Sequence, residues 1–254
     1  MQIQFYKYQS SGNNFILIDL ISQETNYYNL IEQLIKDPVV RKSDGILFIS
    51  KSNENDFELS FYNPDGSESF CGNGSLCSLH YLKSNNKIND EALFSCQNHE
   101  YSAIINSEIK LKMQDITSYK YFGKDYFINT GAPHHVKFVD DANNFDIKKE
   151  AIAIRNLPFY EQMDCNVNVV SDLGNGSIYV RTFEKGVERE TLSCGTGAVA
   201  SVIAFSLKNK YNVEKVMTRG GELKVTFQKN RLNEFTNIYL IGNPLLEYQG
   251  KIHL

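Results

Sequence analysis

Two short stretches, Cys71-Gly72-Asn73-Gly74 and Cys194-Gly195-Thr196-Gly197, decide the fold of this chain. Each has one cysteine, then a Gly-x-Gly turn, then small and apolar residues that can start a helix. A helix N-terminus presents backbone N–H groups without intrahelical partners and the positive end of the helix dipole. Such a position binds an anion and favours a thiolate over a thiol. The sequence therefore predicts two cysteines, each at the start of a helix.

The two cysteines are best interpreted as a pair. One such element would make a nucleophile or a redox site, whereas two indicate two-base proton transfer at a carbon next to a carboxylate. In that chemistry one sulfur, as thiolate, removes a proton while the other, as thiol, delivers one from the opposite face. The remaining cysteines are Cys77, Cys96 and Cys165. Their spacing is neither that of a disulfide framework nor that of a zinc finger, so we expect no metal site.

Landmarks recur along the chain at a nearly constant distance. Cys71 and Cys194 are 194 − 71 = 123 residues apart, and the turn glycines Gly12 and Gly131 are 131 − 12 = 119 apart. Nearly equal shifts indicate an internal duplication. We expect one half over 1–118 and the other over 119–246, and the C-terminal strand 247–254 is a candidate addition to the first half.

Alternation and turn residues predict the elements of each half. In the first half we expect two strands within 3–19, a helix over 29–36, strands at 46–49 and 57–62, a helix over 75–83, and strands near 91–96, 101–106 and 108–114. In the second half we expect strands at 136–139, 166–170 and 177–184, helices over 148–154 and after Cys194, and strands at 223–227 and 237–241.

Composition limits the possible partners. The chain has 254 residues and a formal net charge of −4, which gives no support for nucleic acid or an anionic membrane as a partner. No apolar run reaches the length of a membrane span, and the first ten residues have no signal-peptide core. We therefore expect a cytoplasmic protein that acts on a small molecule.

An ordered series of motifs supports a family resemblance. The chain resembles the diaminopimelate epimerase family through Gly12-Asn13-Asn14-Phe15, Asn63-Pro64-Asp65-Gly66-Ser67-Glu68, Cys71-Gly72-Asn73-Gly74, Gly131-Ala132-Pro133-His134, Asn166-Val167-Asn168, Glu184-Lys185-Gly186 and Glu190-Thr191-Leu192-Ser193-Cys194-Gly195-Thr196-Gly197. The resemblance implies an α+β fold of two pseudo-symmetric domains, each a mixed, mostly antiparallel sheet curled around a central helix. It also implies epimerisation of LL-diaminopimelate to the meso form, for lysine and peptidoglycan synthesis, by a homodimeric isomerase without cofactor.

The resemblance also implies roles for individual residues. Cys71 and Cys194 match the two acid/base thiols, and His134 and Glu184 match positions that tune them. Residues that match contacts to the substrate are Asn13, Asn63, Gly72, Asn73, Asn166, Glu184, Lys185, Gly195 and Thr196.

Two departures leave alternatives open. Many family members have Asn at the position of Ala132 and Arg at that of Lys185, and both contacts hold the distal end of the substrate. A lysine keeps the positive charge but loses the bidentate fork that suits a carboxylate. The alternatives are therefore a racemase of another amino acid on the same fold and a non-catalytic binding protein.

Overall fold

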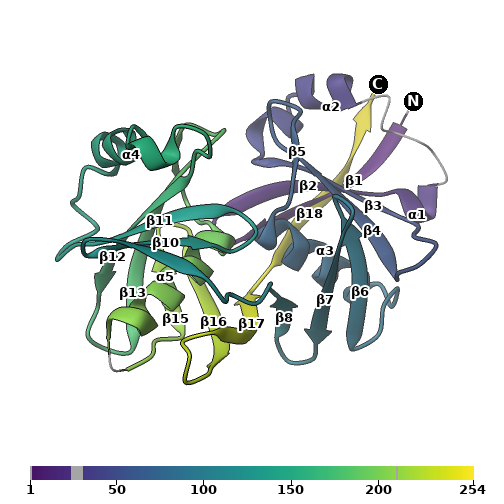
Figure 1. Cartoon of the computed structure of the whole chain (residues 1–254). Coiled ribbons are helices and arrows are strands. Elements are labelled where there is room, and N and C mark those ends of the chain that lie inside the picture. Colours follow the sequence, from purple (N-terminus) through teal and green to yellow (C-terminus); the bar gives the residue numbers. More distant parts are fainter. Residues whose placement is uncertain (1, 24–30, 210) are drawn as a thin grey trace. The chain divides into compact units, whose positions relative to one another are not determined.

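The structure is a computed structural model that describes residues 2–23, 31–209 and 211–254. The chain divides into two compact units (Figure 1): unit 1 comprises residues 1–112 and 241–254, and unit 2 comprises residues 113–240. No helix in the described part of the chain is long and apolar enough to cross a membrane.

Unit 1 contains most of the first half of the sequence and the last strand. Its elements are β1 (Gln2–Ser10), β2 (Asn13–Asp19), α1 (Leu20–Gln23), α2 (Ile31–Lys36), η2 (Val40–Lys42), β3 (Gly45–Ser50), β4 (Phe57–Tyr62), β5 (Glu68–Ser69), α3 (Gly72–Ser84), β6 (Glu91–Cys96), β7 (His99–Ile105), β8 (Ile109–Lys112) and β18 (Leu245–His253). The helix expected over 29–36 corresponds to α2, and residues 29 and 30 lie outside the described residues.

Unit 2 contains the second half. Its elements are β9 (Tyr119–Phe122), β10 (Asp125–Asn129), β11 (Pro133–Phe138), α4 (Ile147–Arg155), η3 (Pro158–Tyr160), β12 (Asn166–Asp172), β13 (Ser177–Glu184), β14 (Arg189–Thr191), α5 (Gly195–Lys208), β15 (Lys215–Thr218) and β16 (Gly221–Lys229). Strand β17 (Phe235–Gly242) contains the boundary at 240/241. The strands β5, β9, β10, β14 and β15 were not expected from the sequence.

The two units repeat one pairing scheme. In unit 1, β1 and β2 are antiparallel, β2 and β3 parallel, β3 and β4 antiparallel, β4 and β6 parallel, and β6 and β7 antiparallel. In unit 2 the same order of pairings joins β10, β11, β12, β13, β15 and β16. The short strands β5 and β14 pair antiparallel with β4 and β13 and lead into Cys71 and Cys194. The predicted α+β fold of two pseudo-symmetric domains, each with mixed, mostly antiparallel strands around a central helix, is confirmed.

Each unit has one helix that is buried on all sides. In α3 the residues from Gly72 to Leu79 are all buried, and the helix packs against β1, β2, β3, β4, β7 and β8. In α5 the run from Gly197 to Ser206 is buried, and the helix packs against β10, β11, β12, β13 and β16. A helix that is apolar or small around its whole circumference belongs in a core. This burial of the two central helices sets the position of their first residues, the two cysteine motifs.

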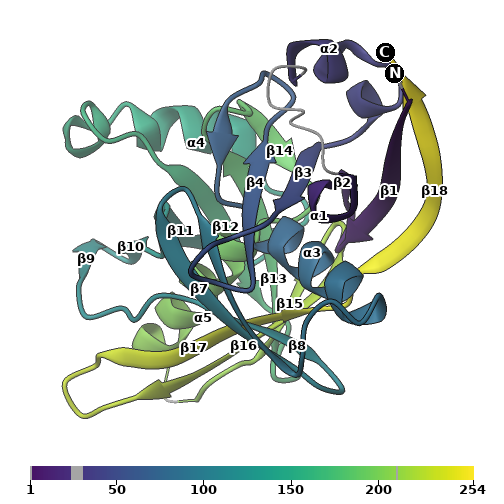
Figure 2. The same ribbon diagram turned by 90° about the vertical axis from the view of Figure 1, so that its right-hand side faces the viewer.

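The division between the units differs from the expected boundary. The expected boundary between residues 118 and 119 lies inside unit 2, because the backbone N–H groups of Met113 and Ile116 already donate to the carbonyls of Ile238 and Phe235 in that unit. The chain returns to unit 1 at residue 241, six residues before the start of the expected C-terminal strand 247–254. Strand β18 then runs antiparallel beside β1, from Leu245 opposite Gln9 to His253 opposite Gln2, as the yellow and purple strands show in Figures 1 and 2.

Candidate active site

The two motif cysteines occupy the same position on their helices. Cys71 is the N-cap of α3 and Cys194 is the N-cap of α5, with nearly identical backbone angles of φ −132°, ψ 112° and φ −137°, ψ 114°. An extended residue before a helix directs the orphan N–H groups of the first turn toward its own side chain. Both thiols are partly exposed. The chain thus places each cysteine at the positive end of a helix dipole, which favours an anion, and in Cys71 the sulfur also accepts a hydrogen bond from a backbone N–H of the first turn.

The other three cysteines have a different environment. All are buried, and burial raises the pKa of Cys96 and of Cys165 to about 12 and that of Cys77 well above its usual value. A thiol that stays protonated at neutral pH is a poor base and nucleophile. These three cysteines therefore pack as small apolar groups.

The second glycine of each motif is required by close packing. A Cβ on Gly74 would lie 2.8 Å from the Cδ2 of Leu47, and a Cβ on Gly197 would lie 2.5 Å from the Oδ1 of Asn168 and 3.0 Å from the Oγ1 of Thr182. Contacts this short force atoms to move. The glycines let each helix start lie directly on the strands beneath it, which explains the Cys-Gly-x-Gly pattern in both halves.

In unit 1 the start of α3 is tied to the start of β2. The Sγ of Cys71 accepts a hydrogen bond from the backbone N–H of Gly74 at 3.4 Å. The buried side chain of Asn73 donates through Nδ2 to the Oδ1 of Asn13 at 2.7 Å. Two of the predicted site residues therefore contact each other directly, although they are 60 positions apart in the sequence.

Asn63 directly follows β4, and its side-chain amide forms hydrogen bonds with residues of the turn that follows. Its Nδ2 donates to the backbone carbonyl and hydroxyl oxygens of Ser67 and to the Oγ of Ser69, at 3.0 to 3.1 Å. Asn63 also borders a cavity of about 570 Å³ whose wall includes the cationic side chains of Lys36 and Arg41. None of these hydrogen bonds connects Asn63 with Cys71.

In unit 2 a chain of polar contacts runs from the thiol into the core. The Sγ of Cys194 lies 3.4 Å from the Oγ1 of Thr196, which lies 3.0 Å from the Nε2 of His134. The Nδ1 of His134 lies 3.0 Å from the Nδ2 of Asn168, whose Oδ1 accepts a hydrogen bond from the Oγ1 of Thr182 at 2.8 Å. His134 therefore reaches the thiol through a threonine hydroxyl.

The imidazole of His134 is neutral at physiological pH. Its side chain lies in the interior of unit 2, and this burial is the main cause that lowers its pKa to about 3. A histidine with so low a pKa cannot take up a proton from solvent near pH 7. It can still pass on a hydrogen bond, because a neutral imidazole has one donor and one acceptor nitrogen.

Asn166 is the first residue of β12, and Glu184 is the last residue of β13. The carboxylate of Glu184 accepts a hydrogen bond from the hydroxyl of Thr191, in the segment that leads to Cys194. The amide of Asn166 donates to the carbonyl of Pro133 at 3.3 Å and accepts from the backbone N–H of Lys185 at 3.0 Å. The side chain of Lys185 is exposed. Asn166 thus joins three strand ends that carry predicted site residues.

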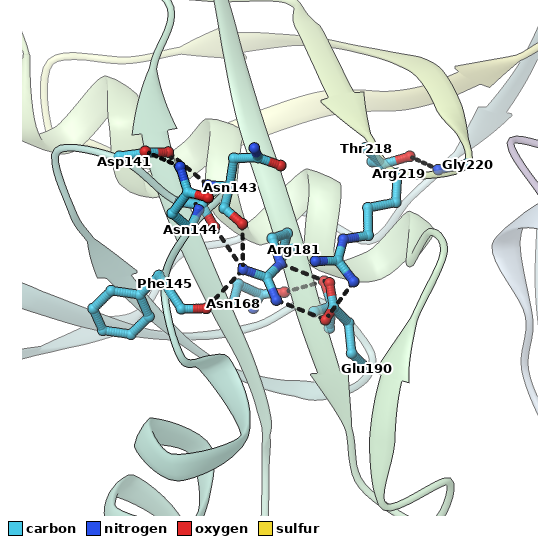
Figure 3. Close-up of polar contacts among 12 residues, drawn as sticks. Asp141, Asn143, Asn144, Phe145, Asn168, Arg181, Glu190, Thr218, Arg219 and Gly220 are labelled. Carbon is cyan, nitrogen blue, oxygen red and sulfur yellow. Dashed lines mark hydrogen bonds and ion pairs between the residues drawn. The ribbon is translucent and has the colours of Figure 1, made fainter.

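The segment before Cys194 is anchored by a buried arginine (Figure 3). The guanidinium of Arg181 forms two hydrogen bonds of 2.7 Å with the carboxylate of Glu190, which also accepts from the Nη1 of Arg219 at 3.0 Å. The Nη1 of Arg181 donates to three backbone carbonyls before α4, those of Ala142, Asn143 and Phe145. A bidentate pair restricts both partners in distance and direction. Glu190 of strand β14 is thereby held in place, four residues before the thiol of Cys194.

Sequence reasoning missed four of these residues. Asn168 appeared only as part of a motif, and Thr182, Arg181 and Glu190 were assigned no role. A signal existed for Asn168, which is a polar residue between the apolar Val167 and Val169; in the structure both Asn168 and Thr182 are buried. Buried polar side chains in strands require hydrogen-bond partners.

No metal centre is evident in residues 2–23, 31–209 and 211–254. Within these ranges no group of three or more His, Cys, Asp or Glu side chains is arranged to hold a metal ion.

Solved structures that share this fold include proteins of more than one named kind. A phenazine biosynthesis protein of the PhzF family from Bacillus anthracis matches with a TM-score of 0.77 and 13% identity, with all of both chains covered. A probable proline racemase from Agrobacterium radiobacter, solved with bound carbonate, matches with a TM-score of 0.64 and 13% identity over 99% of this chain and 93% of that chain. At this identity the likeness establishes the fold alone.

Sequence relatives are more specific. A diaminopimelate epimerase from Flavobacterium psychrophilum is 38% identical over 248 residues, which cover 94% of this chain and 96% of the relative. One from Aquifex aeolicus is 31% identical and covers 98% of each chain. The family model for diaminopimelate epimerase matches residues 5–115 and 126–246, which include both cysteine motifs. This chain belongs to the diaminopimelate epimerase family.

Proposed function

We propose that this chain converts LL-diaminopimelate into meso-diaminopimelate with Cys71 and Cys194 as its two acid/base groups. Its family makes it an isomerase of the amino-acid epimerase class. The observation that carries the two-thiol mechanism is the repeated geometry: two partly exposed thiols, each at the N-cap of a buried helix, each after a short strand.

The proposed reaction needs one thiolate and one thiol. The thiolate takes the proton from the α-carbon, and the electron pair left there is delocalised into the adjacent carboxylate. The thiol then gives its proton to the opposite face of the same carbon. The charges balance, because one sulfur gains the proton that the other loses. Reaction in the reverse direction exchanges the roles of the two sulfurs.

Backbone donors at the helix starts suit the carboxylate of the reacting carbon. We assign this carboxylate to the N–H groups of Gly72, Asn73, Gly195 and Thr196, because the first N–H groups of a helix lack intrahelical partners and lie at the positive end of the dipole. The same donors would stabilise the negative charge that develops as the proton leaves. The rest of the substrate is assigned to Asn13, Asn63, Asn166, Glu184 and Lys185.

The cellular setting follows from the same assignment. Meso-diaminopimelate serves lysine and peptidoglycan synthesis, and we place the enzyme in the cytoplasm, acting without pyridoxal phosphate, metal or nucleotide. We also propose a homodimer. Unit 1 offers exposed apolar side chains on β18, those of Leu245, Leu246 and Tyr248, that a second copy could cover.

The experiment is an isotope-exchange assay in D₂O. Wild-type protein is incubated with LL-diaminopimelate, and both the meso product and deuterium at the α-carbon are measured. We expect deuterium in the newly formed meso product, because the proton delivered comes from a thiol in exchange with solvent. Cys71→Ala and Cys194→Ala should each abolish conversion, and the buried Cys77→Ala is the matched control that retains it.

A panel of substrates separates the alternatives. Monocarboxylic L-amino acids are assayed beside diaminopimelate, because Ala132 and Lys185 depart from the usual distal contacts. Faster exchange with a monocarboxylic amino acid would reject the substrate assignment and keep the two-thiol chemistry. Full activity in either motif-cysteine variant would reject the mechanism.

A further inference from the structure

We propose that Asn168 is a positioning residue that fixes which nitrogen of His134 carries the proton, so that the hydroxyl of Thr196 donates its hydrogen to the Sγ of Cys194. The inference rests on the proposed function in one respect: it takes Cys194 as an acid/base thiol. It adds a side-chain network, contained in unit 2, that favours the thiolate form of that residue.

The orientation of the Asn168 amide is determined by its neighbours. One end of the amide faces the backbone carbonyl of His135 at 3.3 Å. A carbonyl oxygen can only accept a hydrogen bond, so this end must be the NH₂ group. The opposite end, the Oδ1, then accepts from the hydroxyl of Thr182 at 2.8 Å. The side chain of Asn168 is fully buried, so no solvent competes for these positions.

The amide orientation in turn determines the form of the imidazole. The Nδ2 of Asn168 lies 3.0 Å from the Nδ1 of His134 and can only donate. Nδ1 must therefore present a lone pair, and the proton of the neutral ring resides on Nε2. A doubly protonated ring would place an N–H against an NH₂ group. The low pKa of His134, about 3 because of burial, agrees with a ring that stays neutral.

The hydroxyl of Thr196 then has one direction left for its hydrogen. The Nε2–H of His134 donates to Oγ1 at 3.0 Å, and the remaining polar partner of that hydroxyl is the Sγ of Cys194 at 3.4 Å. The hydroxyl of Thr130 donates to the carbonyl of Thr196 at 3.2 Å and helps to hold this residue. A hydrogen bond donated to sulfur stabilises the thiolate over the thiol.

Close packing keeps the network in register with the helix. The first turn of α5 lies so near the amide that a Cβ on Gly197 would come within 2.5 Å of the Oδ1 of Asn168. Thr182 and Arg181 are successive residues of β13, so their side chains point to opposite faces of the strand. One strand therefore holds the segment before Cys194 from one face and the amide that orients His134 from the other.

The two thiols differ in what supplies their donor. The hydrogen bond to the Sγ of Cys71 comes from the backbone N–H of Gly74, which no side-chain substitution in unit 2 removes. For Cys194 one donor is a side-chain hydroxyl whose direction depends on His134 and Asn168. Cys71 thus provides an internal reference in the same protein.

The test combines Asn168→Asp with Thr196→Val. A carboxylate at 168 can only accept, so the Nδ1 of His134 should become the protonated nitrogen. Nε2 then accepts from Thr196, and the Sγ of Cys194 loses its donor. Thr196→Val removes the donor directly and leaves Asn168 and the ring as they are. Both variants keep side-chain size nearly constant.

Two measurements report the outcome without any turnover. The ¹⁵N chemical shifts of histidine-labelled protein, assigned with His134→Asn, show which ring nitrogen is protonated. Initial rates of iodoacetamide alkylation, measured by peptide mass spectrometry near pH 7, report the thiolate fraction of Cys194 relative to Cys71. We expect Nε2–H in the wild type and in Thr196→Val, and Nδ1–H in Asn168→Asp. Relative alkylation of Cys194 should fall about tenfold in each single variant, the size of one hydrogen bond.

The double variant separates this network from simple charge repulsion. With the hydroxyl absent, Asn168→Asp should add little to the loss, whereas a purely electrostatic effect of the new carboxylate would add to it. The proposal is overturned by a wild-type ring protonated on Nδ1, by unchanged alkylation in Thr196→Val, or by additive losses. Because neither measurement needs substrate, these results stand whether or not the epimerase assay succeeds.

Discussion

Replacement of Arg181 by leucine should destabilise unit 2 severely. The side chain of Arg181 is 6% exposed and forms a bidentate pair with Glu190 at 2.7 Å. Its loss would also leave three backbone carbonyls without this donor. Removal of one partner of a buried ion pair costs about 3–5 kcal/mol. We expect the lower end, about 3 kcal/mol, because Arg219 still contacts the carboxylate in this variant.

Arg219→Leu is the matched control, since both arginines contact the same carboxylate. Arg219 is 43% exposed and makes one hydrogen bond of 3.0 Å to Glu190. An exposed ion pair of this kind contributes roughly 1 kcal/mol or less. The structure therefore predicts a difference of about 2 kcal/mol or more between two arginine-to-leucine changes around one glutamate.

The assay is thermal denaturation together with hydrogen exchange of β13 and β14. A loss of about 3 kcal/mol corresponds to a decrease in Tm of roughly 6–12 °C in a chain of this size. Amides of β14 should lose protection first, because Glu190 is its central residue. Equal stability of Arg181→Leu and Arg219→Leu would refute the argument that burial and the bidentate geometry make the difference.

Three further predictions test other parts of the structure. Gly197→Ala should lower the free energy of unfolding by about 1–3 kcal/mol, because the new Cβ would displace the hydrogen-bonded amide of Asn168. Gly74→Ala should cost less, because its Cβ meets only the end of the Leu47 side chain. Equal Tm values for the two variants would contradict this argument. Lys185→Arg combined with Ala132→Asn should preserve or improve kcat/KM for diaminopimelate, and a loss would indicate a pocket for another amino acid. The pKa of Asp19 is lowered, because hydrogen bonds from Lys87 and Tyr81 outweigh the opposing effect of burial. The contribution of this carboxylate to stability should therefore be present above pH 3.8 and be lost as the pH falls through its lower folded pKa. Asp19→Asn should remove this pH dependence of Tm.

The local pattern of apolar and turn residues in the sequence predicted much of the fold. The spacing of apolar residues and turns predicted both central helices, most of the strands around them and the duplication, because these features depend on neighbours in sequence. The helix after Cys71 begins at Gly72 and ends at Ser84, against an expected 75–83. Helix ends depend on capping by a particular side chain, which spacing alone does not reveal.

Features that depend on pairing over long sequence distances were less accessible. Strand β18 joins unit 1 through β1, some 240 residues away, and begins at Leu245, where a polar and exposed strand shows no alternation. The short strands β5 and β14 have two and three residues, too few for a periodic pattern. Their partners in the sheet, and not their own sequences, make them strands.

The sequence by itself determined the family, the two cysteines and their position at helix starts, because a Cys-Gly-x-Gly turn before a small, apolar run has one local solution. Only the tertiary structure decided how each thiol is supported. Asn168, Thr182 and His134 come from three strands, and two pairings bring them together. The parallel pairing of β11 with β12 sets His134 beside Asn166, and the antiparallel pairing of β12 with β13 sets Asn168 opposite Thr182. Register between strands is a property of the whole sheet, so the network that orients a proton toward Cys194 cannot be found in any one segment of the chain.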